Sequence, residues 1–150
     1  MKRVNFLVIV MIAVFLIVSC KGEDNIETLI QPTLSNIPTP LPGKVSVIGK
    51  VISKKSNLPI DEIDVWLAKV IRQEEEAVYV LDTINSPSIL TTANGEFQIL
   101  NVSPGEYVLV IGNPEIMYEI ISDETGKAKV WNFKEGQVED VGELIVFTIQ

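Results

Sequence analysis

Residues 91–111 read TTANGEFQILNVSPGEYVLVI, and this stretch decides the fold. Asn94-Gly95 is a strong hairpin signal, because both residue types tolerate the positive φ angles of a tight turn. Pro104-Gly105 supplies a second turn, in which proline presets φ and glycine takes the left-handed position. The stretch therefore predicts two strands bounded by tight turns. The side chains expected on one face of each strand are Phe97 and Ile99, then Tyr107, Leu109 and Ile111.

Period-two alternation of apolar residues continues on both sides of this stretch. Turn chemistry at residues 54–59 separates two alternating segments upstream, and residues 124–127 separate two more downstream. No segment after residue 43 sustains the 3.6-residue period of a helix. Many short strands with regular turns predict an all-β fold, a single antiparallel β-sandwich. The further strands are expected at residues 45–52, 63–68, 77–82, 117–121, 128–133 and 142–149.

Turn and core residues across residues 43–150 carry a resemblance to a known family. They are Gly49-Lys50-Val51, Leu58-Pro59, Val65-Trp66-Leu67, Asn94-Gly95-Glu96-Phe97, residues 102–109 and Val141-Gly142-Glu143-Leu144. The pattern resembles the carboxypeptidase regulatory-like family of immunoglobulin- or transthyretin-like β-sandwiches. It departs from that family in the acidic connection 73–76 and the polar segment 86–90. The resemblance implies a sandwich that usually serves as an accessory, spacer or binding module, and fold alone does not fix function.

Residues 1–20 have the three parts of an export signal. Lys2 and Arg3 form the positive start, residues 6–18 are an apolar run, and the small Ser19 precedes the expected cut. A thirteen-residue helix spans about 20 Å, which is short of the roughly 30 Å hydrocarbon core of a bilayer. We therefore expect residues 1–19 to be a helical signal peptide, and a permanent transmembrane anchor is the weaker alternative.

The end of the apolar run, Ile17-Val18-Ser19-Cys20, resembles the lipobox of bacterial lipoproteins. The resemblance implies diacylglycerol on the Cys20 sulfur, cleavage between Ser19 and Cys20, and often acylation of the new amine, commonly with palmitate. One acyl chain binds a membrane marginally, at about 0.8 kcal/mol per buried CH₂, whereas two or three hold nearly permanently. The alternative is an unmodified cysteine at the end of an ordinary signal peptide. The expected location is the extracytoplasmic face of a bacterial cell membrane.

Residues 20–43 are predicted to be the lipidated cysteine and a proline-containing tether. Pro32, Pro38, Pro40 and Pro42 favour extended backbone and are incompatible with a helix. Residues 21–43 would span roughly 25–30 Å as a flexible coil. The alternative is an N-terminal strand packed on the domain. The sequence thus divides into a signal peptide (1–19), an anchored tether (20–43) and a sandwich (44–150).

Composition excludes several classes of function. Loss of residues 1–19 removes Lys2 and Arg3 and no acid, and takes the net charge from −8 to −10. That charge disfavours nucleic acid, whose phosphates are held mainly by lysine and arginine. The single cysteine excludes an intrachain disulfide, and the absence of histidine removes the commonest general base and zinc ligand. We therefore predict that the chain has no catalytic residues, no cofactor and no metal site, and that it is not an enzyme.

Three weaker signals remain. Acidic clusters on loops could bind Ca²⁺, although solvated surface is the favoured interpretation. Trp66 and Trp131 are candidate ligand contacts as stacking platforms, and Trp66 falls opposite Val65 and Leu67 and so faces outward. The alternative is that both indoles cover the core or an edge. A hydrolase that uses only carboxylates would need two converging acids, and no pair suggests itself.

The predicted function is therefore a membrane-anchored, non-catalytic lipoprotein. Its sandwich is expected to bind or space components of the cell envelope, with the membrane as partner through the N-terminal lipid and no nucleic acid. A further partner, an envelope protein or a glycan, stays unidentified. The alternative is a carbohydrate- or protein-binding accessory module that uses exposed Trp66 and Trp131.

Overall fold

The computed structural model describes residues 39–73 and 76–147. The predicted signal peptide, Ser19, Cys20 and the tether up to residue 38 lie outside the described residues. These described ranges contain no helix, and therefore none long and apolar enough to cross a membrane.

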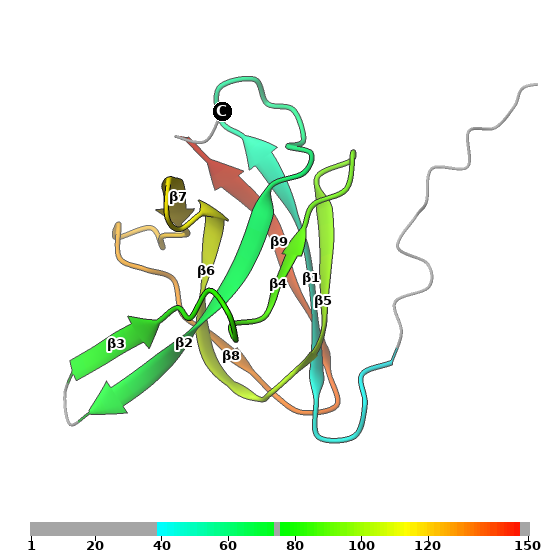
Figure 1. Ribbon diagram of the computed structural model, residues 1–150, viewed down its shortest axis with the longest axis vertical. Helices are drawn as coiled ribbons and strands as arrows, with labels where there is room; N and C mark the ends of the chain where they lie inside the picture. Colours follow the sequence, from blue (N-terminus) through cyan, green and yellow to red (C-terminus); the bar gives the residue numbers. More distant parts are fainter. Residues whose placement is uncertain (1–38, 74–75, 148–150) are drawn as a thin grey trace, which may run out of the picture. The chain divides into compact units, whose positions relative to one another are not determined.

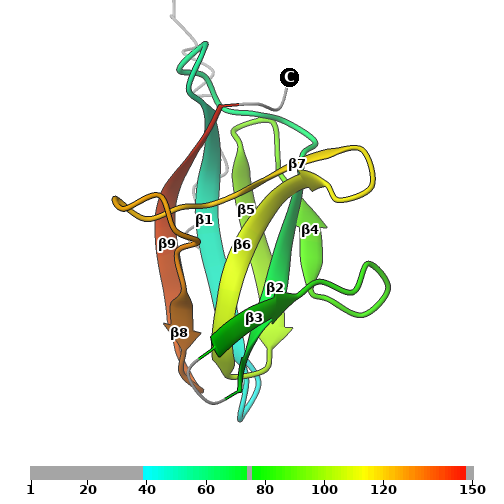
Figure 2. The ribbon, with the colours of Figure 1, turned by 90° about the vertical axis from the view of Figure 1, so that its left-hand side faces the viewer.

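The described chain forms nine strands in two facing sheets (Figures 1 and 2). The smaller sheet has the order β5-β1-β9. The larger sheet is built on the pair β2-β6, with β3 and β4 along one edge and β7 and β8 along the other. The predicted all-β sandwich is confirmed over this part of the chain. The strands are β1 (Val45–Ser53), β2 (Asp64–Gln73), β3 (Glu76–Val80), β4 (Ser88–Leu90), β5 (Glu96–Val102), β6 (Gly105–Asn113), β7 (Met117–Ile120), β8 (Trp131–Phe133) and β9 (Val138–Val146).

The main core lies between the two sheets, and period-two alternation builds it. The side chains predicted to share a face on β5 and on β6 are all buried there. Burial of apolar area at about 25 cal/mol per Å² is the main favourable term for such a core. The sequence therefore predicted the inward faces of these strands correctly. Core members include Val45, Val47, Val51, Val65, Leu67, Phe97, Ile99, Tyr107, Leu109, Ile111, Phe133, Leu144 and Val146.

A second apolar cluster lies on the outer face of the larger sheet. It contains Ala68 and Val70 of β2 with Val108 and Val110 of β6, and all four are buried. Figure 2 shows the segment that follows β7 crossing the outer side of β6, and Ala128 of that segment packs on the cluster. Strands buried on both faces read as continuous apolar runs rather than alternating ones. This double burial explains why residues 107–111 read YVLVI without a polar break.

The predicted hairpin at Asn94-Gly95 is wrong. The turn joins β4 to β5, but β4 pairs with β2 in the larger sheet and β5 pairs with β1 in the smaller one. Only Gly95 has positive φ, at 72°, and its N–H donates to the carbonyl of Thr92 at 2.7 Å. The turn chemistry was therefore read correctly as a tight turn, but the turn carries the chain from one sheet to the other.

The prediction of a purely antiparallel sandwich is also wrong at one pair. β9 runs parallel to β1, from Ser46 opposite Val138 to Ser53 opposite Val146, while the other strand pairs are antiparallel. β9 begins at Val138 rather than at the expected residue 142, because Gly142 sits inside the strand. The register shifts there, and Gly142 has a φ of +78°. Such a shift with glycine at positive φ is a β-bulge, not a strand boundary.

Strand bounds differ from the expected ones at three further places. β4 lies at residues 88–90, within the polar segment 86–90 for which the sequence predicted no strand. β2 continues to Gln73, five residues past its expected end, and pairs with β3 as a projecting arm (Figure 1). β8 covers only residues 131–133 of the expected 128–133. The first two differences create the opening described next.

Candidate functional site

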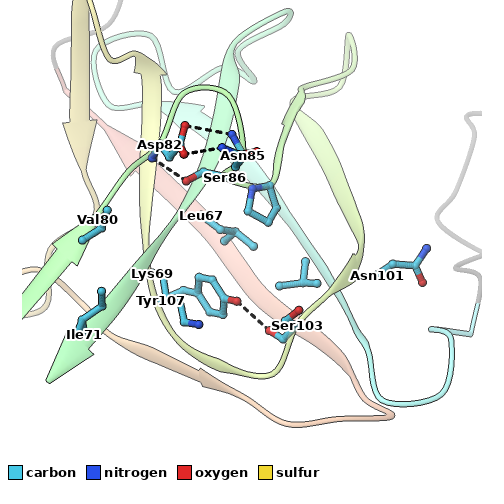
Figure 3. Close-up of a pocket in the computed structure, with 12 residues that line it drawn as sticks. Leu67, Lys69, Ile71, Val80, Asp82, Asn85, Ser86, Asn101, Ser103 and Tyr107 are labelled. Atoms are coloured by element: carbon cyan, nitrogen blue, oxygen red, sulfur yellow. Dashed lines mark hydrogen bonds between the residues drawn. The ribbon is translucent and has the colours of Figure 1, made fainter.

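A cavity of about 340 Å³ opens at the side of the sandwich (Figure 3). We call it the lateral pocket; it lies between the β2–β3 arm, the loop 81–87 and the β5–β6 turn. β3 pairs with β2 from Lys69 onward and β4 pairs with it only up to Trp66, so the chain between them leaves the sheet edge. A single backbone bond bridges the gap, from the N–H of Leu67 to the carbonyl of Pro87 at 2.9 Å. The lateral pocket lies between this displaced segment, residues 81–87, and β2.

The apolar lining of the lateral pocket is continuous with the core. Leu67 and Val102 lie at its floor and are 0% and 1% exposed. Ile71 and Val80 form the wall on the arm side and are 41% and 47% exposed. Large apolar side chains that face solvent beside a cavity are typical of a surface that binds a ligand or another protein. Pro87 completes this lining.

Asp82 marks one end of the pocket and is held by its own turn. Its carboxylate accepts hydrogen bonds from the N–H groups of Ile84 at 2.8 Å and Asn85 at 3.2 Å, and from the side-chain amide of Asn85 at 2.6 Å. The N–H of Asp82 donates to the hydroxyl of Ser86 at 2.9 Å. The Asn85 amide, followed by the Ile84 N–H, lowers the pKa of Asp82. Asp82 is therefore a fixed negative charge at neutral pH.

Lys69 lies at the other end, beside Tyr107 (Figure 3). Within residues 39–73 and 76–147 its ammonium has no ion-pair partner. Arg72 on the same arm differs, because its guanidinium pairs with Glu106 at 2.6 Å and 3.1 Å. That pairing lowers the pKa of Glu106 and raises that of Arg72. Lys69 is thus the cation of the arm that remains available to a ligand.

Tyr107 braces the floor of the pocket. Its hydroxyl donates to the carbonyl of Ser103 at 2.9 Å, and its ring stacks on Phe133 with centroids 5.5 Å apart. A tyrosine near the start of a strand that bonds back to the preceding turn is a tyrosine corner, a common brace in β-sandwiches. Burial raises the pKa of Tyr107, so the hydroxyl stays a donor across the physiological range.

Tyr107→Phe is expected to lower the free energy of unfolding by about 1–2 kcal/mol, because the Ser103 carbonyl loses its partly buried donor. Urea denaturation followed by tryptophan fluorescence measures the change. Tyr118→Phe is the matched control, since Tyr118 is half exposed, and it should leave stability unchanged. A Tyr107→Phe variant as stable as the parent would contradict the bracing role.

The two tryptophans are not brought together. Trp66 faces the outer side of the larger sheet, as expected from the alternation, and packs half-buried on the second cluster. Its indole N–H donates to the carbonyl of Gly112 at 3.1 Å. Trp131 packs half-buried on the main core, with the Lys129 ammonium 4.8 Å from its ring centroid. Neither lines the lateral pocket, and their role as ligand contacts stays a prediction.

Within residues 39–73 and 76–147 the acidic clusters do not converge on one point. Among the described residues, no three Asp, Glu, Cys or His side chains come close enough together to bind a metal ion. Asp123 caps its own turn, where its carboxylate accepts from the N–H and hydroxyl of Thr125 and from the N–H of Lys127. The Thr125 hydroxyl, followed by its N–H, lowers the pKa of Asp123. This cluster therefore shapes a turn.

Sequence reasoning missed the lateral pocket. Asp82 and Asn85 carry a readable signal, because an aspartate three residues before an asparagine and four before a serine favours a side-chain-capped turn. Lys69 and Ser103 carry none, since their proximity depends on which strands pair. The pocket could be found only once the arm and the loop were placed.

No family model matches the chain, and no curated protein matches it. A candidate carbohydrate-binding protein of Pseudomonas aeruginosa is 15% identical with a TM-score of 0.44, over 72% of this chain and 92% of that one. A 5-hydroxyisourate hydrolase of Klebsiella pneumoniae is 9% identical with a TM-score of 0.38, over 69% and 84%. A 9R-lipoxygenase of Cyanothece is 14% identical with a TM-score of 0.39, and this chain spans 16% of it. Likenesses of this size carry no argument about function.

Proposed function

We propose that this chain is a non-catalytic binding module, held at the extracytoplasmic face of a bacterial membrane by lipid on Cys20. The lateral pocket is the observation that carries the binding role. Its volume of about 340 Å³ lies within the range of small-ligand sites. Its floor reaches buried Leu67, while Lys69 and Asp82 place opposite charges at its rim.

The anchoring part of the proposal rests on sequence. Ile17-Val18-Ser19-Cys20 ends an apolar run too short to span a bilayer, and the only cysteine stands where a lipid would be attached. Two or three acyl chains would hold the mature chain at the membrane almost permanently. The prolines that follow would keep the sandwich clear of the lipid surface. The partner in the envelope, protein or glycan, is part of the proposal and is not identified.

The non-catalytic part is supported by the direction of the carboxylate shifts. Asp82, Glu106 and Asp123 have lowered pKa values, each because hydrogen bonds favour the ionised form. A carboxyl group that acts as a general acid near neutral pH needs a raised pKa instead. The chain also has no histidine to serve as a base. These features favour binding over turnover.

Cys20→Ala tests the anchor. In a bacterial host fed labelled palmitate, the parent chain is expected to take up label, and Cys20→Ala is expected to lose all of it, because no other cysteine exists. The uncleaved variant should also retain residues 1–19. Ser19→Ala is the matched control and should keep its label, since alanine also fits the lipobox. An unlabelled parent, or a labelled Cys20→Ala chain, would refute lipidation at this position.

A further inference from the structure

The lateral pocket has two oppositely charged ends. Asp82 sits with Asn85 under the loop 81–87, and Lys69 sits beside Tyr107 near the β5–β6 turn (Figure 3). A carboxylate has about four lone-pair sites, and the turn of Asp82 occupies three of them. One acceptor site therefore remains for a ligand donor. The Lys69 ammonium, which has no ion-pair partner among the described residues, offers donors at the opposite end.

The surface between these ends is aliphatic. The half-buried Pro87 and the exposed Ile71 and Val80 of the arm form it, and the buried Leu67 and Val102 lie beneath them. No aromatic face is available there, because Tyr107 is 4% exposed and its hydroxyl already donates to Ser103. Sites for sugars or bases usually provide a stacking platform, and this pocket provides none. Its lining suits a branched aliphatic side chain.

We propose that the lateral pocket binds a short peptide with free termini and an aliphatic side chain. The peptide ammonium would bind Asp82, its carboxylate would bind Lys69, and its side chain would pack on the accessible Pro87, Ile71 and Val80. A simple anion would be repelled by Asp82 and by the negative net charge of the chain, while a simple cation would be repelled by Lys69. A zwitterion satisfies both ends. This inference rests on the proposed function only in taking the pocket as the binding site.

The test is a titration of the full chain, in detergent micelles, with the dipeptide Ala-Leu. Isothermal calorimetry should show saturable binding. N-acetyl-Ala-Leu and Ala-Leu amide each lack one terminal charge, so each should bind about five- to tenfold more weakly. These comparisons change the ligand only, so they remain informative whether or not any variant folds. Absence of saturable Ala-Leu binding, or equal binding of the capped dipeptides, would overturn the proposal.

Two variants test which terminus of the dipeptide binds at which end of the lateral pocket. Lys69→Met should weaken Ala-Leu by the same factor as amidation, and amidation should then cost nothing further, because the two changes remove one interaction. Asp82→Asn should likewise make N-acetylation neutral. Lys134→Met, and Asp123→Asn in a similarly capped turn outside the pocket, are the matched controls and should bind normally. Thermal unfolding confirms that each variant is folded.

The outcomes separate this inference from the proposed function. A chain that takes up palmitate at Cys20 but does not bind Ala-Leu would refute only the proposed peptide site. A chain that binds Ala-Leu but takes up no lipid would refute only the proposed lipid anchor. Tighter binding of a hexuronic acid than of Ala-Leu, lost in Lys69→Met, would show a site for sugar acids and overturn the peptide assignment.

Discussion

Phe133→Ala is expected to lower the free energy of unfolding by about 3–5 kcal/mol, which is typical of a large aromatic side chain removed from a core. Phe133 is 2% exposed and belongs to the main core, although its strand β8 is only three residues long. Its ring stacks on Tyr107, whose hydroxyl braces the β5–β6 turn. The truncation would therefore leave a cavity and also release one side of that brace.

Urea denaturation with a tryptophan fluorescence readout measures the effect. Asn132→Ala is the matched control, because Asn132 lies on the same strand and is exposed. It should change stability by less than about 0.5 kcal/mol. If both variants lost the same small amount, β8 would not be part of the cooperative core, and the description of the larger sheet would be wrong at that edge.

Gly95→Ala is expected to lower the free energy of unfolding by about 2–4 kcal/mol, from two causes that add. Gly95 has a φ of +72°, which is unfavourable for alanine. An added Cβ would also lie 2.5 Å from the carbonyl oxygen of Val51 and 2.9 Å from Cβ of Pro59. Neither neighbour can retreat easily, because the N–H of Val51 donates to the Gly95 carbonyl and the N–H of Ile60 donates to the Val51 carbonyl.

Gly126→Ala separates the two causes. Gly126 has a similar φ of +80°, but an added Cβ there meets no atom within 4 Å. That variant should therefore lose only the conformational part, about 1–2 kcal/mol. The difference between the two variants, measured by urea denaturation, isolates the steric conflict where the chain crosses between sheets. Equal losses would mean that β1 and the crossing turn are not in close contact.

The sequence predicted the inward faces well and the strand partners poorly. Alternation at Phe97, Ile99, Tyr107 and Leu109 reports local burial, and all four are in the core. Asn94-Gly95 reports only that the chain turns sharply, and a local turn does not specify which sheet receives each strand. The parallel pairing of β9 with β1 joins segments more than ninety residues apart, so no local pattern predicts it.

The candidate site was harder still to predict. The alternation correctly predicts that Trp66 lies on the outer face, but its indole N–H donates a hydrogen bond to the carbonyl of Gly112. The sequence singles out neither Lys69 nor Asp82, because a lone charged residue at the end of a predicted strand usually faces solvent. They become a pair only because the chain after β3 leaves the sheet edge and the loop 81–87 returns to Leu67. Side chains that meet through such topology leave no spacing signal.

The central claim, a sandwich tethered by lipid, is tested most directly by the mass of the N-terminal peptide of the chain isolated from its native host. We predict a peptide that begins at Cys20 and carries diacylglycerol on sulfur, with or without an acyl group on the amine. A peptide that begins at Met1, or one that begins at an unmodified Cys20, would contradict the account.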